Sequence, residues 1–426
     1  MESPMTRRRF LGTSAAGAAG ILRAASVKRE LPKATADTCI FIWLAGGMCH
    51  VDTFDPKPKG DGGKVPGGYF NAIRTAVPAI EVCEHLPRVA ARMDRCAILR
   101  TLHHDFPNHS TAVDFVHTGR VASGTIEYPS VGSMVAHELG GFDPKAPAYV
   151  VVGYPMKPRG PGFLGGRYNY IYVTDSDASP AGLKPPDNVS TGRYQRRLEG
   201  LRAFTRSYVE NLQQNSEVVE YEAAAHKGFE MMGEKFQRAF MIKDEPASLR
   251  EAYGEEFGQR LLLSRRLVEH GIRFVECSFN LHFINGYGWD THEFAQQRVD
   301  LIIRQLDRGL AALMDDMERR KMLDRTLVVI GTDFGRPPDF DGGGGRGHQS
   351  TTYSSVILGG GVKGGMAVGV TDALGREIRE RPISIPDWHA TIHRALGIDP
   401  EKPLMTPDNR PVPITDYGKP VEEILS

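Results

Sequence analysis

The sequence predicts an α/β fold in which helices flank a central, mostly parallel sheet, with a helical insertion. Six short runs rich in apolar and β-branched residues are bounded by turn residues, as buried strands are. They alternate with segments of helical period, which is the pattern of βαβ units with both sheet faces covered. The six runs are residues 39–44, 97–102, 149–152, 272–275, 327–330 and 354–358.

The length of the chain allows one large α/β domain or two smaller ones, and its composition is that of a packed protein. The chain has 426 residues, of which 41% are hydrophobic, as expected of a globular protein. Its 52 basic and 52 acidic residues give a formal net charge of zero, so nothing favours nucleic acid or an anionic membrane as a partner. The five cysteines are scattered and form no C-x-x-C pair, so we expect mostly buried thiols.

The N-terminus carries a twin-arginine export motif. The segment from Thr6 to Leu11 reads T-R-R-R-F-L, which fits S/T-R-R-x-F-L, and a mildly apolar stretch free of acids follows over residues 12–22. The alternative interpretation is a disordered basic tail. We expect a signal peptide over residues 1–30, recognised by the twin-arginine export machinery, and a periplasmic or otherwise exported protein. No other segment reaches the ~20 apolar residues that a membrane span needs.

Two regions interrupt the alternation of strands and helices within the domain expected over residues 31–426. Residues 153–191 are rich in Gly and Pro and predict a long ordered loop near the site. Residues 192–269 are charged and helical in period, which predicts a helical insertion or cap. The clearest helix is expected over residues 293–320. Its apolar stripe comprises Val299, Ile302, Ile303, Leu306, Leu310, Leu313, Met314 and Met317.

Histidine and aspartate recur next to the predicted strands. In doubly wound sheets, ligands bind beyond the C-terminal ends of the strands, so these loops are where a site is expected. The candidates are His50, Asp52 and Asp55 after the first strand, His103, His104 and His109 after the second, Asp290 and His292 after the fourth, Asp333 after the fifth, and His348 before the sixth. At least one of His103 and His104 is expected to be a surface or supporting residue.

This set of side chains indicates metal chemistry. Mixed imidazole and carboxylate ligands suit Zn²⁺ or Mn²⁺, whereas all-oxygen sites suit Mg²⁺ or Ca²⁺. Such a site would activate water and bind a tetrahedral oxyanion. Arg336 and Arg346 could neutralise oxyanion charge, and Ser110 or Thr111 is expected to cap a helix whose N-terminus favours an anion.

Several motifs resemble the bacterial exported family called domain of unknown function 1501. They are residues 45–57, residues 288–292 (GWDTH), residues 331–336 (GTDFGR), and residues 347–348 (GH) followed by residues 356–361 (VILGGG). The resemblance runs from about residue 36 to residue 400. That family is similar in layout to the alkaline phosphatase superfamily, which includes sulfatases and cofactor-independent phosphoglycerate mutases. The resemblance implies an alkaline-phosphatase-like sheet and one or two divalent metals.

The resemblance also implies roles for individual residues. The spacing from His109 to Arg120 is similar to the sulfatase signature, in which the nucleophile opens a helix ending in Thr-Gly-Arg, and His109 falls at the nucleophile's position. The residues that resemble the superfamily's later metal ligands are Asp290, His292, Asp333 and His348, and residues 383–398 resemble its closing helix.

The sequence also departs from the superfamily pattern. Gly46 and Gly47 stand where the superfamily carries an Asp, which leaves His50 and Asp52 as replacement ligands. Phe334 stands where a His is frequent. The C-x-P-x-R context is missing, so formylglycine chemistry is not expected.

We therefore expect an exported metal-dependent hydrolase of sulfate or phosphate esters, with a small-molecule or glycan ester as substrate. The expected metal ligands are His50, Asp52, Asp290, His292, Asp333 and His348, and the expected catalytic residues are His109, Ser110, Thr111, Arg336 and Arg346. His109 could also be a further ligand. The alternative is a catalytically inactive exported protein of the same fold that binds metal or glycans, with residues 193–269 as its recognition surface. A secreted structural protein is a third interpretation.

Overall fold

A computed structural model describes residues 32–144, 146–153, 160–174, 176, 188–211, 234–279, 282–283 and 286–426. Residues 33–426 form one compact unit built on a nine-stranded sheet. The strand order is β12-β4-β11-β10-β1-β7-β5-β6, and β15 pairs with β4. The predicted export signal over residues 1–30 lies outside the described residues.

All six predicted apolar runs are strands of this sheet. They are β1 (Thr38–Trp43), β4 (Cys96–His103), β5 (Tyr149–Val152), β7 (Phe274–Ser278), β10 (Thr326–Gly331) and β11 (Tyr353–Gly359). The sheet also contains β6 (Ile171–Val173), β12 (Met366–Val368) and β15 (Ile383–Ser384), which were not predicted. These strands have only two or three residues, which is too short for the alternation of side chains to produce a recognisable pattern.

The strand directions confirm the mostly parallel sheet. β1 pairs in parallel with β10 and β7, and β5 pairs in parallel with β7 and β6. β11 is antiparallel to both β10 and β4, so β4 and β10 run in the same direction. The C-terminal ends of β1, β4, β7 and β10 therefore share one edge of the sheet.

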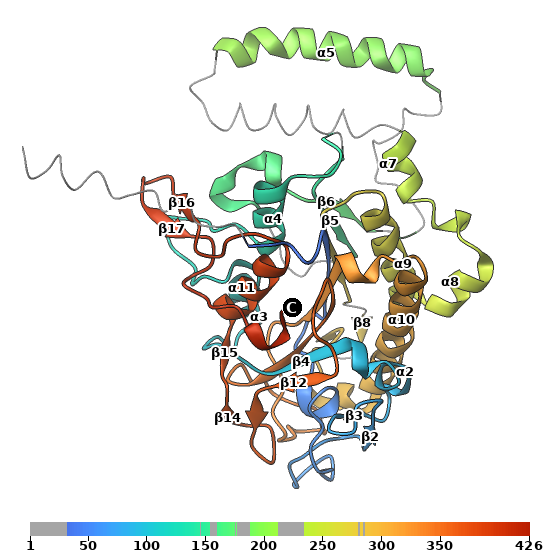
Figure 1. The fold of residues 1–426 in the computed structure, drawn as a ribbon, viewed down its shortest axis with the longest axis vertical. Helices are drawn as coiled ribbons and strands as arrows, with labels where there is room; N and C mark the ends of the chain where they lie inside the picture. Colours follow the sequence, from blue (N-terminus) through green and yellow to red (C-terminus); the bar gives the residue numbers. More distant parts are fainter. Residues whose placement is uncertain are drawn as a thin grey trace, which may run out of the picture. The chain divides into compact units, whose positions relative to one another are not determined.

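Helices cover both faces of the sheet, which is why its central strands are buried along their whole length (Figure 1). One layer contains α2 (Pro87–Ala90), α8 (Ala247–Tyr253), α9 (Glu256–Glu269) and α10 (Val299–Arg319). The other contains α3 (His109–Thr118), α4 (Val131–Leu139) and α11 (Ile385–Ala395). In β1, Ile40 and Ile42 pack toward the first layer, and Phe41 and Trp43 pack toward the second.

The long predicted helix is confirmed with one difference at its start. A 3-10 turn, η6 (Glu293–Arg298), precedes α10. All eight residues of the predicted apolar stripe are buried. The stripe packs α10 against α9 and the sheet because its spacing places these side chains on one side of the helix.

The two interrupting regions are partly described. In the predicted loop, η3 (Gly162–Leu164), η4 (Gly166–Tyr168) and the unpredicted β6 are described, whereas residues 154–159, 175 and 177–187 lie outside the described residues. The predicted helical region contains α5 (Thr191–Asn211), α7 (Glu234–Ala239), η5 (Ile242–Asp244), α8 and α9, with residues 212–233 outside the described part. The side chains of α9 join the main core, so this last helix is a layer of the domain and not a cap.

The remaining elements are short. In the described part of the chain, four strand pairs lie outside the main sheet: β2 (Ala72–Arg74) with β3 (Glu81–Cys83), β8 (His282–Phe283) with β9 (Gly286–Tyr287), β13 (Val370–Thr371) with β14 (Ile378–Glu380), and β16 (Pro403–Met405) with β17 (Pro411–Pro413). The other 3-10 turns are η1 (His50–Asp52), η2 (Met93–Arg95), η7 (Leu323–Arg325) and η8 (Glu422–Ile424).

Two helix starts show how local chemistry sets the ends of elements. The N-cap of α3 is Asn108, whose side chain accepts a hydrogen bond from the Ser110 amide at 3.0 Å. The predicted cap at Ser110 or Thr111 is therefore wrong, because an Asn two residues earlier already supplies the oxygen. α11 begins with a capping box between Ser384 and Asp387, within the predicted closing helix.

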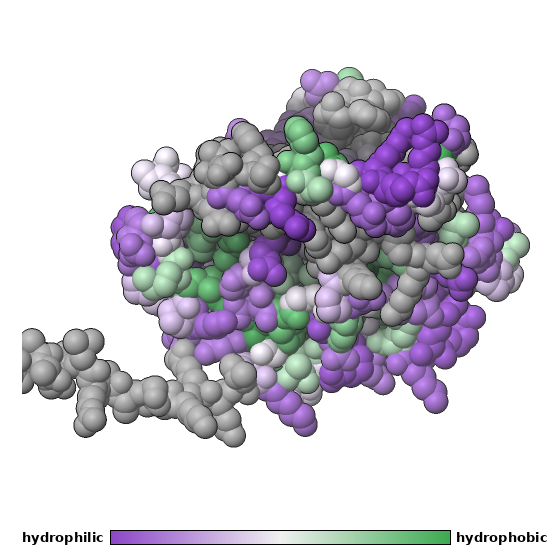
Figure 2. Space-filling model, turned by 90° about the horizontal axis from the view of Figure 1, so that it is seen from above, coloured by the Kyte–Doolittle hydropathy of each residue, from purple (hydrophilic) through white to green (hydrophobic). Residues whose placement is uncertain are grey.

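The surface and the cysteines agree with the composition. All five cysteines are buried and unpaired, as predicted. Hydrophilic side chains make up most of the described surface on the face in Figure 2. Among the helices of the described residues, none is both long enough and apolar enough to cross a membrane.

Because of two buried histidines of α11, we expect the folded protein to lose stability in mild acid. His389 donates to the Val116 carbonyl at 2.8 Å and His393 to the His389 carbonyl at 2.8 Å, and both rings are buried. Burial lowers the pKa of His389 to about 3 and that of His393 to about 4, from 6.5. At these two residues the unfolded chain therefore binds two more protons than the folded chain between about pH 4 and 6.5, so their contribution makes stability fall as the pH falls through this window.

Denaturant unfolding at pH 7, 6 and 5 measures this effect. The free energy of unfolding should decrease by up to about 2.7 kcal/mol per pH unit for two protons. The variant His393→Leu should lose about half of this slope. A slope that is unchanged in the variant would contradict the assignment.

Candidate metal centre

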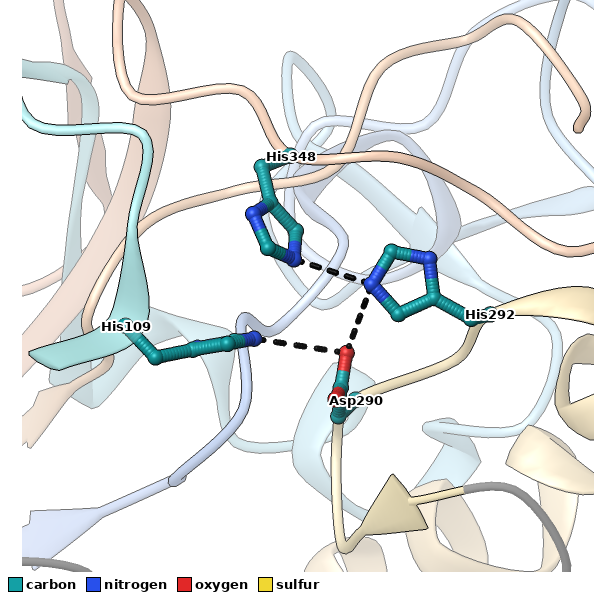
Figure 3. A group of neighbouring side chains, drawn as sticks. All are labelled: His109, Asp290, His292 and His348. Carbon is teal, nitrogen blue, oxygen red and sulfur yellow. Dashed lines mark hydrogen bonds and ion pairs between the residues drawn. The ribbon is translucent and has the colours of Figure 1, made fainter.

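Four side chains from distant parts of the chain converge at one edge of the sheet. His109, Asp290, His292 and His348 each offer one ligand atom, and these atoms all lie within 4.8 Å of one another. Asp290 Oδ1 is 3.1 Å from His292 Nε2 and 3.4 Å from His109 Nε2, and His292 Nε2 is 2.9 Å from His348 Nε2. Figure 3 shows the three rings and the carboxylate directed at a common point.

The strand directions explain this convergence. His109 opens α3 after β4, and Asp290 and His292 follow β7. His348 precedes β11, which runs in the opposite direction and so begins at the same edge. The backbone amide of Arg346 also donates to the Thr291 carbonyl at 2.9 Å, which joins the two loops that carry three of the four side chains.

Each of the three histidines has an acceptor at Nδ1. His109 Nδ1 is 2.5 Å from Asp333 Oδ2, His292 Nδ1 is 3.4 Å from Asp341 Oδ2, and His348 Nδ1 is 2.6 Å from the Pro107 carbonyl. A neutral imidazole that donates from Nδ1 carries its lone pair on Nε2, so in their neutral forms all three rings would direct a lone pair at the common point. His109 Nε2 is buried, and it faces Asp290 Oδ1 at 3.4 Å without a well-formed hydrogen bond. This donor set fits a divalent metal ion.

At Asp290 and His348, the surroundings favour the protonation state that binds metal. Burial opposes ionisation of Asp290, but His109 and Arg336 hold the pKa of this carboxyl well below its usual range. Burial, together with Arg336, lowers the pKa of His348 to about 4. Asp290 is therefore ionised and His348 neutral at neutral pH.

His109 has the opposite shift. Burial lowers its pKa, but Asp290 and Asp333 outweigh burial and raise the pKa to about 9. In the absence of metal the ring therefore carries a proton between two carboxylates. A metal ion bound at Nε2 would displace that proton.

Asp333 stands behind His109 and not at the common point. Its Oδ1 accepts hydrogen bonds from the Gly46 amide at 3.1 Å and from Thr332 Oγ1 at 3.2 Å, and its side chain is fully buried. Phe334 packs against both His109 and His348, with ring centroids 4.6 Å and 4.5 Å apart. Asp333 therefore orients His109, whereas the sequence had predicted it to be a metal ligand.

His50 and Asp52 lie outside the cluster, unlike the prediction. His50 is buried, and its Nε2 is 2.8 Å from the Gly375 carbonyl, while burial lowers its pKa. Asp52 accepts from the Tyr69 amide and Gln296 Nε2, both at 2.6 Å, and from Arg346 at 2.8 and 3.1 Å. Because each carboxylate oxygen of Asp52 already accepts from two donors, it has no lone pair left for a metal.

The predicted catalytic arginines are also committed to other groups. Arg346 is fully buried and donates to Asp52 and to the Gly67 and Pro337 carbonyls. Arg336 is fully buried and donates to backbone carbonyls and to Asp290. Ser110 and Thr111 are exposed in the first turn of α3, and Thr111 Oγ1 donates to the Asn108 carbonyl at 3.1 Å. Neither arginine has a donor directed at solvent, so an oxyanion role is not supported for them.

The contacts of Asp52 lead us to expect that its substitution weakens metal binding indirectly. Gln296 lies in η6, the turn that begins directly after His292, and Arg346 lies two residues before His348, so Asp52 connects both ligand loops. Asp52→Asn should lower metal affinity about 10- to 100-fold, as changes behind ligands do.

Metal titration by calorimetry measures this, with Asp55→Asn as the matched control. Asp55 is also buried, but binds Lys57, Arg100 and Thr371 instead. Wild-type affinity in Asp52→Asn would contradict the role of Asp52.

Two features of the centre were not predicted from the sequence. Asp341 lies next to a glycine-rich turn, and the Pro107 carbonyl belongs to a residue without a functional side chain. Neither residue stands at a characteristic spacing from the histidine that it contacts. The recurrence of Asp near His along the chain could have indicated Asp341. His103 and His104 also stay outside the cluster, and His104 Nε2 is 2.6 Å from the Asp333 carbonyl.

A separate cavity of about 570 Å³ opens along the flank of α3. Its lining includes Asp114, His117, Arg120 and Glu127, and none of the four cluster residues contributes to it. The cluster therefore does not lie in this cavity.

Comparison with known proteins identifies one matching family. A family model described as "Protein of unknown function (DUF1501)" matches residues 36–425. No curated protein matches the sequence.

Several solved structures are similar to this one. The sulfatase PsFucS1 from Pseudoalteromonas sp. is 12% identical with a TM-score of 0.42, and the match covers 99% of this chain and 76% of that one. The phosphonate monoester hydrolase SpPMH from Silicibacter pomeroyi is 10% identical with a TM-score of 0.39, covering 90% and 76%. A protein in the alkaline phosphatase superfamily from Vibrio parahaemolyticus is 7% identical with a TM-score of 0.38, covering 86% and 69%.

Proposed function

This chain belongs to the DUF1501 family, and we propose that it is a metal-dependent hydrolase of sulfate or phosphate esters that acts outside the cytoplasm. The observation that carries the proposal is the convergence of three imidazoles and one carboxylate within 4.8 Å. Each Nδ1 atom lies beside an acceptor, so with all three rings neutral the cluster would present three lone pairs and one negative charge to an ion. Such a set suits a divalent cation.

The donor set supports a choice of metal. Three imidazole nitrogens and one carboxylate oxygen favour Zn²⁺ or Mn²⁺ over Mg²⁺ or Ca²⁺, which prefer oxygen ligands. Asp290, His292 and His348 would bind the ion, and His109 would complete the set. Asp333 would keep the proton of the His109 ring on Nδ1.

The roles of the remaining residues follow from their contacts. A divalent ion held at the cluster would polarise an ester oxygen and lower the pKa of water to near neutrality. Ser110 lies next to His109 in the exposed first turn of α3, so it is the candidate side-chain nucleophile, with water as the alternative. Arg336 and Arg346 would hold the loops, since their donors bind protein acceptors.

Elemental analysis and a substrate panel test the proposal. Protein purified without chelator should contain stoichiometric Zn or Mn, and should hydrolyse members of a panel of aryl and sugar sulfates and phosphates. A chelator should abolish turnover, and added metal should restore it. Protein without a stoichiometric divalent ion would refute the proposal, whereas bound metal without turnover would support the glycan-binding alternative.

Export rests on the N-terminal motif and is tested separately. Replacing Arg7 and Arg8 by lysine should keep the full-length protein in the cytoplasm of a host with the twin-arginine machinery. Arg9→Lys is the matched control, because position 9 is the variable position of the motif. Equal export of both variants in cell fractions would contradict the proposal.

A further inference from the structure

Arg336 lies in a shell of oxygen atoms beside the metal centre. Its Nε donates to the Gly47 carbonyl at 3.3 Å, its Nη1 to the Arg346 and Gly347 carbonyls at 2.9 and 3.2 Å, and its Nη2 to the Gly46 carbonyl. The side chain is fully buried. Carbonyl oxygens are the ligands with which proteins hold hard cations, and here they surround a guanidinium.

The same guanidinium contacts two members of the cluster. Arg336 Nη2 pairs with Asp290 Oδ1, and Nη1 lies 3.2 Å from His292 Nε2. Nη1 has two N–H groups and three acceptors within reach. It therefore keeps both of its carbonyl partners when His292 Nε2 binds an ion.

The loop around Arg336 is built for this close approach. Gly47 has φ +92°, and a Cβ atom there would lie 2.9 Å from Arg336 Nε and 3.0 Å from the Phe334 ring. Only glycine adopts this backbone without strain and leaves room for the guanidinium. Gly46 and Gly47 lie in the loop after β1, which ends at Trp43, and they supply two carbonyls of the shell.

We propose that Arg336 is a built-in second cation of the metal centre, so that the centre takes one divalent ion and not a pair. The proposal rests on the proposed function, because it requires the four-residue cluster to hold an ion. Arginine stays protonated in proteins, so this positive charge is permanent. A second ion would need the oxygen-lined position that the guanidinium fills.

Native mass spectrometry of the wild-type protein, titrated with Zn²⁺ and with Mn²⁺, is the first test. One ion per chain is expected for each metal. Two ions per chain would overturn this inference while leaving the proposed function intact. No bound ion would overturn both.

The variant Arg336→Ala provides a second test. Removal of the guanidinium leaves an oxygen-lined space, so this variant should bind one more cation than wild type, either Ca²⁺ or guanidinium. Its thermal midpoint should rise in millimolar calcium chloride or guanidinium chloride relative to sodium chloride, whereas the wild-type midpoint should not.

The matched control is Leu310→Ala, because Leu310 is equally buried but lies in the apolar core, so its removal leaves no oxygen-lined space. It should lose stability without rescue by either cation. Equal rescue of both variants, or no added cation in Arg336→Ala, would overturn the inference. If Arg336→Ala does not fold, the number of metal ions bound per wild-type chain tests the inference by itself.

Discussion

His348→Ala is expected to lower metal affinity by more than about 100-fold and to abolish any ester turnover. His348 Nε2 faces His292 Nε2 at 2.9 Å, and its ring is held by the Pro107 carbonyl. Changes in residues behind a ligand already cost 10- to 100-fold in affinity, so the loss of a ligand should cost more. Calorimetric titration with Zn²⁺ and elemental analysis of the purified variant measure the effect.

A histidine away from the centre is the control for His348. His137 is half-buried at the end of α4 and pairs with its neighbour Glu138 at 2.9 Å. His137→Ala should retain wild-type metal content and turnover. If His348→Ala kept one tightly bound ion, His348 would not be a ligand and the three-histidine centre would be wrong.

Arg265→Met is expected to destabilise the fold by about 3 to 5 kcal/mol without direct contact with the centre. Arg265 is fully buried between α9 and α10, and it pairs with Glu245 at 2.8 Å, Asp316 at 2.9 Å and Glu269 at 2.5 Å. Asp316 and Glu245 are themselves buried, so the substitution leaves carboxylates with fewer partners in a low-dielectric interior. Urea unfolding followed by circular dichroism measures the loss.

Arg319→Met is the matched control for Arg265. The Arg319 side chain is 66% exposed and lies 3.4 Å from the same Asp316 carboxylate. An exposed pair contributes little, so this variant should stay within about 0.5 kcal/mol of wild type. Equal effects of the two variants would show that burial of the network does not matter.

The sheet edge that carries the centre was predictable from the sequence. Strands such as residues 149–152 and 327–330 read as continuous apolar runs because helices cover both of their faces. Since ligands gather at the C-terminal ends of such strands, the sequence directed attention to the loops around His109, Asp290 and His348, which the structure brings together. The helix α10 was equally predictable, because its apolar stripe is a local property of the sequence.

The division of roles within those loops was not predictable. His50 and Asp52 have the same side chains as the members of the cluster and follow a strand at the same edge, yet both oxygens of Asp52 accept hydrogen bonds from Arg346, Gln296 and Tyr69. These partners are distant in the sequence, so no local pattern reveals them. The cap at Asn108 was missed for the opposite reason, because several adjacent residues could all serve as caps.

The sequence by itself therefore determined the fold class, the main strands, the buried cysteines and the edge at which histidine and aspartate gather. These depend on the periodicity of apolar residues and on strand direction, which are written along the chain. Only the tertiary structure decided that His109 faces Asp290, His292 and His348, that Asp333 stands behind it, and that two arginines are buried among carbonyls. The physical reason is that coordination and hydrogen-bond saturation depend on atoms brought together from different loops, which residue type and spacing do not record.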